Sequence, residues 1–491
     1  MATVPSPGTT GDDIITPGNG DDILYGDPFV DGNPLHLGRG GNDALGATGD
    51  RNSLFGDAYD VSGDARGGND RLAVAGKYNS LIGDAHDLSG DARGGNDRLI
   101  ATGDANILTG DGVYIYANAV GGNDRLIGCT GDGNSLNGDA MVMTPGARGG
   151  NDHLSITGSS NSLNGDAGII FLNARGGNDS LTATGDDNLL CGDASQMAGK
   201  AHCGNDSLTA TGDRNSLFGD AISISERIRG GNDHLTITGD DNRLYGDADA
   251  LPGDARGGND CLSVVGDTNS LIGDGQFVYG NAVGGNDRLI SGTGDDNRLY
   301  GDANVMSGDA RGGNDRLCAT GDYSSLYGDT GYMFDHARGG NDCLTVTGDH
   351  NRLFGDGYSM SDHARGGNDR LIGGRGDDLM VGDAQVMSAT VHGGKDLLWG
   401  DPVRAAAGGA DIFLFTGHSG RDVVLDFRPG EGDRIELAGY GLTDASQLTT
   451  KVAGGSTVID VGASLGEAAH VDTIQLHGFH QPLTDADFVF T

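Results

Sequence analysis

Residues 94–120 read GGNDRLIAT GDANILTGD GVYIYANAV, and variants of this 27-residue unit fill most of the chain. Its opening Gly-Gly-Asn-Asp, or a close variant, occurs fourteen times in the 491 residues. Of the thirteen steps between successive copies, eleven are 27 residues and two are 28. A period that strict is typical of a stacked repeat architecture, in which each unit packs on the one before it. The sequence therefore predicts that acidic residues of successive units line up in columns.

The unit divides into three nine-residue pieces, each a Gly/Asp turn followed by a short alternating run typical of a strand. Leu99 and Leu108 are equivalent in the first two pieces, whereas the third piece places its apolar residue, Ile115, elsewhere. We therefore expect an all-β parallel β-solenoid with 27-residue coils of three short strands. An 18-residue, two-sided β-roll is the alternative, but it would stack first pieces on third pieces. In the 28-residue units, which contain Leu126 and Leu289, we expect a β-bulge in one strand.

The composition excludes several classes of partner. Acidic residues number 71 against 31 basic ones, a net charge of -40, and Gly contributes 92 residues. Such a charge disfavours nucleic acid and anionic membranes as partners and favours a cationic ligand. We find no apolar run of about 18 residues, so we expect no transmembrane segment, and the N-terminal residues lack the features of a cleaved signal peptide.

Three regions follow from the repeat pattern. Residues 1–37 contain two short nine-residue units and are expected to form starter coils, and residues 38–402 carry the array of about fourteen repeats. From about residue 403 the pattern stops, and residues 403–491 are expected to form a small C-terminal β cap, since an open end of a solenoid invites aggregation.

Two nearly unbroken columns of Asp are the candidate metal ligands. The first Asp column closes each Gly-Gly-Asn-Asp and consists of Asp43, Asp70, Asp97, Asp124, Asp152, Asp179, Asp206, Asp233, Asp260, Asp287, Asp315, Asp342, Asp369 and Asp396. The second Asp column consists of Asp57, Asp84, Asp111, Asp139, Asp166, Asp193, Asp220, Asp247, Asp274, Asp302, Asp329, Asp356 and Asp383. Carboxylates in register repel one another unless cations lie among them. Ca²⁺ suits such a column because it takes six to eight oxygen ligands in flexible geometry, whereas Mg²⁺ demands tight octahedral geometry.

The stretch Gly373–Val381, GGRGDDLMV, satisfies every position of the calcium-binding nonapeptide G-G-x-G-x-D-x-U-x. The chain resembles the repeats-in-toxin (RTX) family over nearly all of its length. The resemblance implies Ca²⁺ ligands at Gly373, Gly376 and Asp378, at Asp13 and Asp22 of the starter units, and along the first Asp column. Most units depart from the family pattern by reading Ala-Arg-Gly-Gly-Asn-Asp, so an Arg column (for example Arg66 and Arg93) is an alternative source of positive charge.

The region 403–491 resembles the caps that follow RTX arrays in secreted proteases and haemolysins. The ending Asp487-Phe488-Val489-Phe490 is similar to the uncleaved signal of type I export in that family. The resemblance implies a protein secreted without a cleaved N-terminal signal, which folds where calcium is abundant.

No enzyme motif with complete spacing is present, and we expect no catalysis. The six Cys share no column and are interpreted as scattered free thiols, with one adventitious disulfide as the alternative. The hypothesis from the sequence is a secreted calcium-binding repeat protein with a structural, surface-layer or adhesive role, and cell-surface polysaccharide or self-association as further partners. The alternatives are a non-catalytic, carbohydrate-engaging module of a secreted enzyme system and an ice-binding adhesin, the latter suggested by Thr-x-Thr in several first strands.

Overall fold

The computed structural model describes residues 11–16, 20–27, 38–225, 227–401, 408–465 and 472–491. Parts of the predicted starter coils and of the predicted cap therefore lie outside the described residues. The chain forms two compact units, Met1–Asp249 and Ala250–Thr491. Each unit contains a parallel β-solenoid whose regular coils contribute one strand to each of three sheets, here named A, B and C. The 27-residue, three-strand coil is thus confirmed, and the 18-residue β-roll is not what forms.

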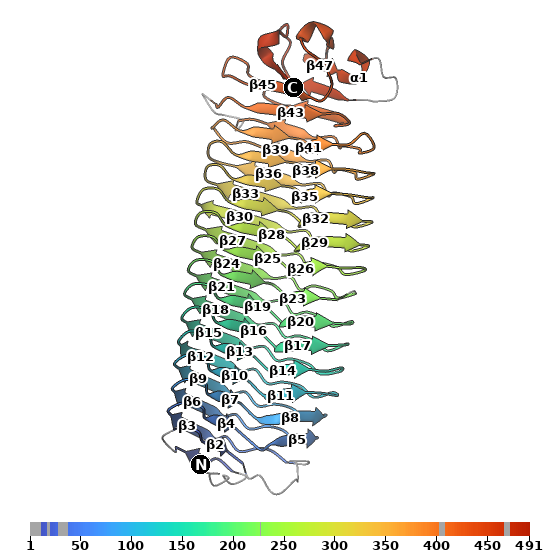
Figure 1. The fold of residues 1–491 in the computed structure, drawn as a ribbon. Helices are drawn as coiled ribbons and strands as arrows, with labels where there is room; N and C mark the ends of the chain where they lie inside the picture. Colours follow the sequence, from blue (N-terminus) through green and yellow to red (C-terminus); the bar gives the residue numbers. More distant parts are fainter. Residues whose placement is uncertain (1–10, 17–19, 28–37, 226, 402–407, 466–471) are drawn as a thin grey trace. The chain divides into compact units, whose positions relative to one another are not determined.

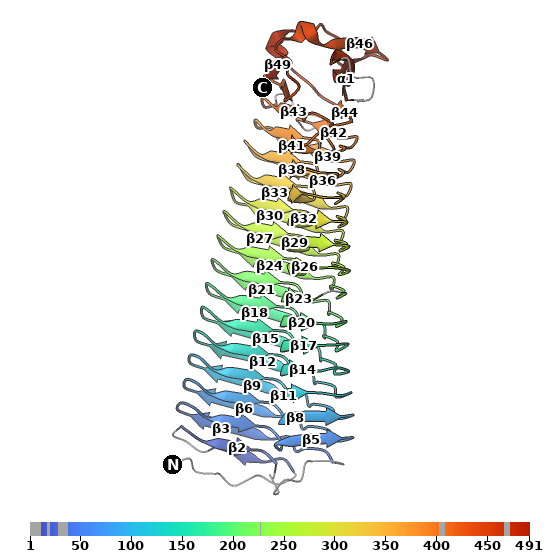
Figure 2. The ribbon, with the colours of Figure 1, turned by 45° about the vertical axis from the view of Figure 1, so that its right-hand side comes forward.

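In the first unit, successive strands of each sheet pair in parallel with the equivalent strand one coil away (Figures 1 and 2). Sheet A contains β1 (Ile14–Ile15), β3 (Ala44–Thr48), β6 (Arg71–Ala75), β9 (Arg98–Thr102), β12 (Arg125–Thr130), β15 (His153–Thr157), β18 (Ser180–Thr184), β21 (Ser207–Thr211) and β24 (His234–Thr238). Sheet B contains β2 (Ile23–Tyr25), β4 (Ser53–Phe55), β7 (Ser80–Ile82), β10 (Ile107–Thr109), β13 (Ser135–Asn137), β16 (Ser162–Asn164), β19 (Leu189–Cys191), β22 (Ser216–Phe218) and β25 (Arg243–Tyr245). Sheet C contains β5 (Asp60–Gly63), β8 (Ala85–Gly90), β11 (Gly112–Ile115), β14 (Ala140–Met143), β17 (Ala167–Phe171), β20 (Ala194–Ala198), β23 (Ala221–Ile224) and β26 (Ala248–Leu251).

The second unit repeats the arrangement. Its sheet A strands are β27 (Cys261–Val265), β30 (Arg288–Thr293), β33 (Arg316–Thr320), β36 (Cys343–Val346), β39 (Arg370–Ile372), β42 (Leu397–Trp399) and β44 (Arg421–Val424). Its sheet B strands are β28 (Ser270–Ile272), β31 (Arg298–Tyr300), β34 (Ser325–Tyr327), β37 (Arg352–Phe354), β40 (Leu379–Val381), β43 (Ile412–Thr416), β45 (Arg434–Ala438) and β49 (Phe488–Phe490). Its sheet C strands are β29 (Gly275–Gly280), β32 (Ala303–Gly308), β35 (Thr330–Met333), β38 (Gly357–Met360) and β41 (Ala384–Met387).

The C-terminal segment continues the solenoid before it departs from it. Strand β43 pairs in parallel with β40, and β44 pairs in parallel with β42, so these two strands extend sheets B and A. Strand β48 (Thr473–Leu476) pairs in parallel with β44, and β47 (Ser456–Asp460) and β46 (Thr449–Ala453) extend sheet A beyond it as antiparallel strands. The short helix η1 (Ala445–Gln447) precedes β46, α1 (Val461–Ser464) lies between β47 and β48, and η2 (Asp485–Asp487) leads into β49.

Columns of aliphatic side chains fill the interior of each coil. In the first unit, Leu99 of sheet A, Leu108 of sheet B and Ile115 of sheet C are each fully buried, and the equivalent residues of neighbouring coils stack on them in register. Successive side chains of a strand alternate between the interior and solvent, which is why a period of two within each piece predicts these strands. Because each coil presents the same residue type to the next, the repeat stacks without loss of packing.

The extra residue of the 28-residue units is a β-bulge, as predicted. The register of β12 shifts between Leu126 and Cys129, and that of β30 shifts between Ser291 and Thr293. Gly128 lies in the bulge of β12 with a φ of 73°, a conformation that favours glycine. The shift is confined to sheet A, because sheet B pairs Ile107 with Ser135 and resumes the regular register.

Candidate metal centre

The first and second Asp columns converge inside the coil. The Gly-Gly-Asn segment that leads into sheet A runs against the Gly-Asp that ends sheet B. One carboxylate oxygen of each of Asp84, Asp97 and Asp111 lies within 4.8 Å of the others. The same closeness holds for Asp57, Asp70 and Asp84, so the two columns interleave into one zigzag. We call this row the carboxylate ladder.

The ladder is buried. All residues of both Asp columns are buried, with Asp84 and Asp111 fully so. One further member, Asp27, was not predicted from the sequence; it precedes Asp57 in the second column and lies within 4.8 Å of Asp43 and Asp57. The Gly-Asp at 26–27, which matches the Gly-Asp before each sheet C strand, was the signal for it. Asp13 begins the first column, since its backbone N–H donates to Oδ1 of Asp43 at 2.6 Å.

In the first column, one carboxylate oxygen accepts a hydrogen bond from the backbone N–H of the equivalent Asp one coil earlier. The backbone N–H of Asp70 donates to Oδ1 of Asp97 at 2.6 Å, and that of Asp97 donates to Oδ1 of Asp124 at 2.6 Å. The other oxygen, Oδ2, is buried and has no hydrogen-bond partner among the described residues at Asp43, Asp70, Asp97, Asp124, Asp152, Asp179, Asp206, Asp287, Asp315, Asp342, Asp369 and Asp396. Such buried oxygens require a cation or a proton, since an unpartnered buried acceptor costs about 1–3 kcal/mol.

The second column behaves in the same way. Asp84 accepts a hydrogen bond from the backbone N–H of Gly95 at 2.8 Å through Oδ2, while Oδ1 of Asp84 is buried without a partner in the described part of the chain. Asp111 differs, because both of its oxygens accept from the backbone N–H of Gly122, at 3.0 and 2.9 Å. One oxygen of most carboxylates is therefore fixed by the backbone, and the other is directed into the ladder.

Glycine carbonyls join the carboxylates. A Cβ placed on Gly83 would overlap both the carbonyl oxygen of Gly110 and Oδ2 of Asp97, so these two oxygens converge on one point. A Cβ on Gly95 would likewise overlap the carbonyl oxygen of Gly68. Only glycine fits these positions, and the cradle it leaves is lined by carboxylate and carbonyl oxygens, the ligands that Ca²⁺ prefers. The donor set thus fits a hard divalent cation.

The electrostatics of the ladder demand neutralisation. Burial, followed by the charges of Asp84 and Asp124, raises the pKa of Asp97 well above its usual range. Burial and the charge of Asp57 raise the pKa of Asp70 to about 9, and burial raises the pKa of Asp124 to about 8. Two unpaired like charges about 4 Å apart cost ~4 kcal/mol at an effective dielectric constant of about 20. At neutral pH the ladder is therefore stable only with bound cations or retained protons.

The predicted Arg pairing does not form along the array. The side chains of Arg66 and Arg93 are exposed, and their backbones pair with each other in a parallel bridge. In the described ranges, no ion pair links an Arg of this column to the carboxylate ladder. The guanidinium groups lie at the surface while the carboxylates point inward, so the Arg column leaves the ladder charge uncompensated.

The nonapeptide Asp378 and the starter residue Asp22 lie in a different column from Asp43 and Asp97. The backbone N–H of Asn351 donates to Oδ1 of Asp378 at 2.8 Å, and that of Asp22 donates to Oδ1 of Asn52 at 3.2 Å. Between these ends, the column contains buried Asn side chains, as at Asn79 and Asn106, which bond to one another. A neutral amide ladder thus occupies the corner between sheets A and B for most of the array.

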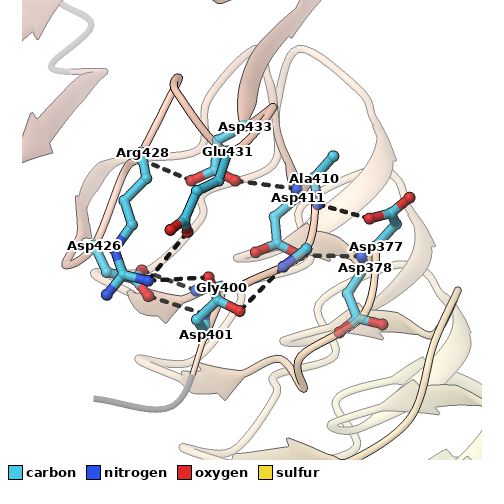
Figure 3. A network of polar contacts seen from close by, with 11 residues as sticks. Asp377, Asp378, Gly400, Asp401, Ala410, Asp411, Asp426, Arg428, Glu431 and Asp433 are labelled. Atoms are coloured by element: carbon cyan, nitrogen blue, oxygen red, sulfur yellow. Dashed lines mark hydrogen bonds and ion pairs between the residues drawn. The ribbon is translucent and has the colours of Figure 1, made fainter. Parts of the chain in front are cut away.

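Near the C-terminal end of the second unit, this Asn column turns acidic again (Figure 3). The backbone N–H of Asp378 donates to Oδ1 of Asp411 at 3.0 Å, and that of Asp411 donates to Oδ1 of Asp433 at 3.2 Å. Burial raises the pKa of Asp411 to about 9 and that of Asp433 to about 7. Gly374 donates its N–H to Oδ2 of Asp378 at 2.8 Å.

The two predicted glycine ligands lie beside this row. A Cβ on Gly373 would overlap the carbonyl oxygen of Gly400, and a Cβ on Gly376 would overlap the side chain of Asp349. The nonapeptide therefore needs glycine for steric reasons at both positions, and Asp378 is the carboxylate that it places here.

In this region the protein supplies its own cation. Arg428 Nη1 lies 3.2 Å from Oδ2 of Asp401, whose side chain is 1% exposed, and 3.3 Å from Oε2 of Glu431 (Figure 3). The backbone N–H of Arg428 also donates to Oδ2 of Asp433 at 2.7 Å. Pairing of an arginine with a buried carboxylate, the alternative to metal considered for the array, is thus seen at Arg428 and Asp401.

A third row of Asp lies at the surface. Asp104 accepts a hydrogen bond from the backbone N–H of Asp132 at 3.1 Å and forms an ion pair of 2.6 Å with Lys77. Because both side chains are exposed, solvent screens these charges, and the fold does not require a bound metal at this row.

The fold and this site together define a class: a parallel β-solenoid repeat protein with a buried, metal-fitting carboxylate ladder. No protein-family model matches the chain, and no curated protein is significantly similar to it. In the described ranges, none of the helices is long and apolar enough to cross a membrane.

Proposed function

We propose that this chain is a calcium-binding repeat protein of the RTX type, which folds as Ca²⁺ enters the carboxylate ladder. The observation that carries the proposal is the row of buried, half-unpartnered carboxylates interleaved with glycine carbonyls, as at Asp84, Asp97 and Asp111. The unfolded chain cannot present such a site, so binding energy contributes directly to folding.

The proposed role is structural or adhesive, at or outside the cell surface. Support comes from the resemblance of the cap region to those of proteins exported by the type I route, and from the absence of complete catalytic motifs in the sequence. A chain whose folding depends on Ca²⁺ stays extended where calcium is scarce and coils where it is millimolar, which suits export before folding.

Calcium stoichiometry tests the proposal. Equilibrium dialysis of the full chain against ⁴⁵Ca²⁺ should give many equivalents per chain that tenfold excess Mg²⁺ does not displace, because Mg²⁺ requires an octahedral site. Binding of one equivalent or none would refute it. Binding displaced equally by Mg²⁺ would point to exposed carboxylates, such as Asp104, as the ligands.

A carbohydrate-engaging module is the second candidate. Large aromatic side chains are exposed on the outer face of sheet C in the second unit: Phe277, Tyr279, Tyr332 and Tyr358. Phe277 and Tyr332 lie in one row with Val305 between them, and the ring of Tyr358 lies edge-on to that of Tyr332 with centroids 6.1 Å apart. Such rows can stack on sugar rings. Saturable binding on a glycan array, lost in Tyr332→Ala, would favour this function.

An ice-binding adhesin is the third candidate. In the first unit, exposed Thr side chains end the six successive sheet A strands from β9 to β24 and lie in register: Thr102, Thr130, Thr157, Thr184, Thr211 and Thr238. The high strand propensity of Thr also explains this row. Thermal hysteresis in dilute solution, reduced by Thr184→Lys, would support ice binding, and its absence would exclude it.

A further inference from the structure

One coil of the first unit departs from the ladder chemistry. Where other units read Gly-Gly-Asn-Asp, residues 203–206 read Cys-Gly-Asn-Asp. In neighbouring coils, this first glycine is required because its Cβ would fall among carboxylate oxygens. A Cβ on Gly176 would overlap Oδ1 of Asp193 and lie 2.6 Å from Oδ2 of Asp166. A Cβ on Gly230 would overlap Oδ1 of Asp247 and lie 2.9 Å from Oδ2 of Asp220.

By the same register, the side chain of Cys203 enters the ladder between Asp193 and Asp220. A carboxylate oxygen of each of these residues and the Sγ of Cys203 lie within 4.8 Å of one another. Cys203 is partly exposed, whereas both carboxylates are fully buried. The thiol therefore occupies the position where an ordinary coil presents only oxygen ligands.

Two further observations indicate a ligand. Oδ1 of Asp193 accepts from the backbone N–H of Gly204 at 3.0 Å, but Oδ2, the oxygen that faces the position of Cys203, is buried without a partner in the described structure. The thioether Sδ of Met197 lies 3.6 Å from Sγ of Cys203. Met197 is a buried core residue of sheet C, aligned with Ile170 and Ile224.

We propose that Cys203, Asp193 and Asp220 form a thiolate–carboxylate site for a thiophilic divalent metal, Zn²⁺, within the otherwise oxygen-lined ladder. Zn²⁺ takes Cys sulfur at about 2.3 Å and carboxylate oxygen at about 2.0–2.2 Å. A tetrahedral ion with those bonds holds its ligands about 3.3–3.8 Å apart, so side-chain adjustments of less than about 1 Å complete the site. Met197 lies where it can shield the metal or approach it as a soft fourth neighbour.

The chemistry of the site separates it from the calcium sites. A thiolate disfavours Ca²⁺, which takes oxygen ligands, and favours Zn²⁺ over Mg²⁺ and Ca²⁺. On binding, the S–H bond of Cys203 breaks, sulfur keeps the electron pair, and the proton passes to solvent. No oxidant or reductant is needed. The proposal does not rest on calcium binding, because sulfur-to-metal absorption reports this site alone.

The test uses the full chain, reduced and saturated with Ca²⁺, titrated with Co²⁺ as a spectroscopic probe and then with Zn²⁺. We expect one Co²⁺ per chain with a sulfur-to-cobalt charge-transfer band that one equivalent of Zn²⁺ abolishes. Cys203→Gly, which restores the residue that other coils use, should fold normally and lose the band and the tight Zn²⁺ equivalent. Cys343→Arg, which restores the usual Arg of Asn-Asp-Arg-Leu at another coil, should keep both.

Two results would overturn the inference. A band that persists in Cys203→Gly would place the metal at another thiol. The second result is that the wild-type chain shows no band and the Cys203→Gly variant binds one more Ca²⁺ than the wild type. This result would mean that the thiol fills the site in place of a cation. Either result leaves the calcium stoichiometry of the remaining coils unchanged, so failure of this proposal is distinguishable from failure of the calcium proposal.

Discussion

The backbone N–H of Asp70 donates a hydrogen bond of 2.6 Å to Oδ1 of Asp97, one coil further along the chain. The bond fixes one oxygen of Asp97 and leaves the other, Oδ2, buried and without a partner in the described ranges. Each coil thus orients the carboxylate of the next, and the fold creates a ligand row by the same contact that sets its register. Stability and metal binding are therefore coupled through the same side chains.

Removing one carboxylate should have opposite effects with and without metal. Asp97→Asn removes a buried charge and is expected to stabilise the chelated chain, because burial raises the pKa of Asp97 well above its usual range. With Ca²⁺ present, the variant should lose ligand charge and about 1–3 kcal/mol of unfolding free energy. Denaturant unfolding in excess Ca²⁺ measures the loss, and the pH at which the chelated chain loses its far-UV β signal measures the gain. Asp104→Asn, at the exposed third row, is the control and should change neither. Equal destabilisation in both conditions would contradict the account.

Glycine in the ladder should be irreplaceable. Gly95→Ala would place a Cβ on the carbonyl oxygen of Gly68 and is expected to cost more than about 3 kcal/mol or prevent folding. Gly46→Ala, in strand β3, is the matched control, because its Cβ would meet the Thr16 methyl at 3.5 Å in ordinary contact. Thermal unfolding in Ca²⁺ compares them. A Gly95→Ala variant as stable as Gly46→Ala would show that the coils stack less closely than described.

The metal-free chain should lose stability as pH rises. Burial raises the pKa of Asp70 to about 9 and that of Asp124 to about 8, whereas an unfolded Asp titrates near about 3.9. The folded state therefore binds more protons than the unfolded state between these values, and its stability falls with increasing pH. The contribution is complete below about pH 4 and is lost as pH rises through about 8–9.

The far-UV β signal of the chelated chain, followed from pH 4 to pH 9, checks this direction: it should be lost as pH rises, and Ca²⁺ should preserve it because metal then replaces the protons. Stability that increases from pH 5 to pH 9 without metal would mean that the ladder carboxylates are ionised and satisfied by other groups.

Arg428 should act as a resident cation. Arg428→Gln leaves the buried Asp401 without its ion-pair partner and is expected to destabilise the second unit by about 1–3 kcal/mol, less than for a fully buried pair because Arg428 is one-third exposed. The double variant Arg428→Gln/Asp401→Asn should recover most of that loss. A double-mutant cycle in unfolding free energy measures the coupling. Arg51→Gln at the exposed Arg51–Asp21 pair is the control. Additive effects would show that the two side chains do not interact.

Most of the fold could be predicted from the sequence, and the reason is periodicity. The 27-residue step and the alternation around Leu99 and Leu108 determine a coil with three strands, and the two 28-residue steps locate the bulges. These signals are local or strictly periodic, so they need no knowledge of the packing.

The arrangement of the site could be predicted only in part. Both Asp columns were visible, but nothing in a linear spacing of 13 or 14 residues shows that Asp84 and Asp97 meet inside the coil. That contact depends on how the Gly-Gly-Asn segment crosses the end of sheet B. The separate column of Asp378 was predictable, because Asn351 precedes it by one period of 27 residues. The spacing of the Arg column shows that its residues are in register, but it does not show whether their side chains point into the coil or toward solvent.

The most direct test of the account is the effect of chelation on the full chain at pH 7.5, followed by far-UV circular dichroism. We predict that exhaustive EDTA removes the β signal, that stoichiometric Ca²⁺ restores it, and that Mg²⁺ at the same concentration does not. An unchanged β signal after exhaustive chelation, with no bound divalent metal detected by elemental analysis, would show that the buried carboxylates stack without cations and would contradict the central claim.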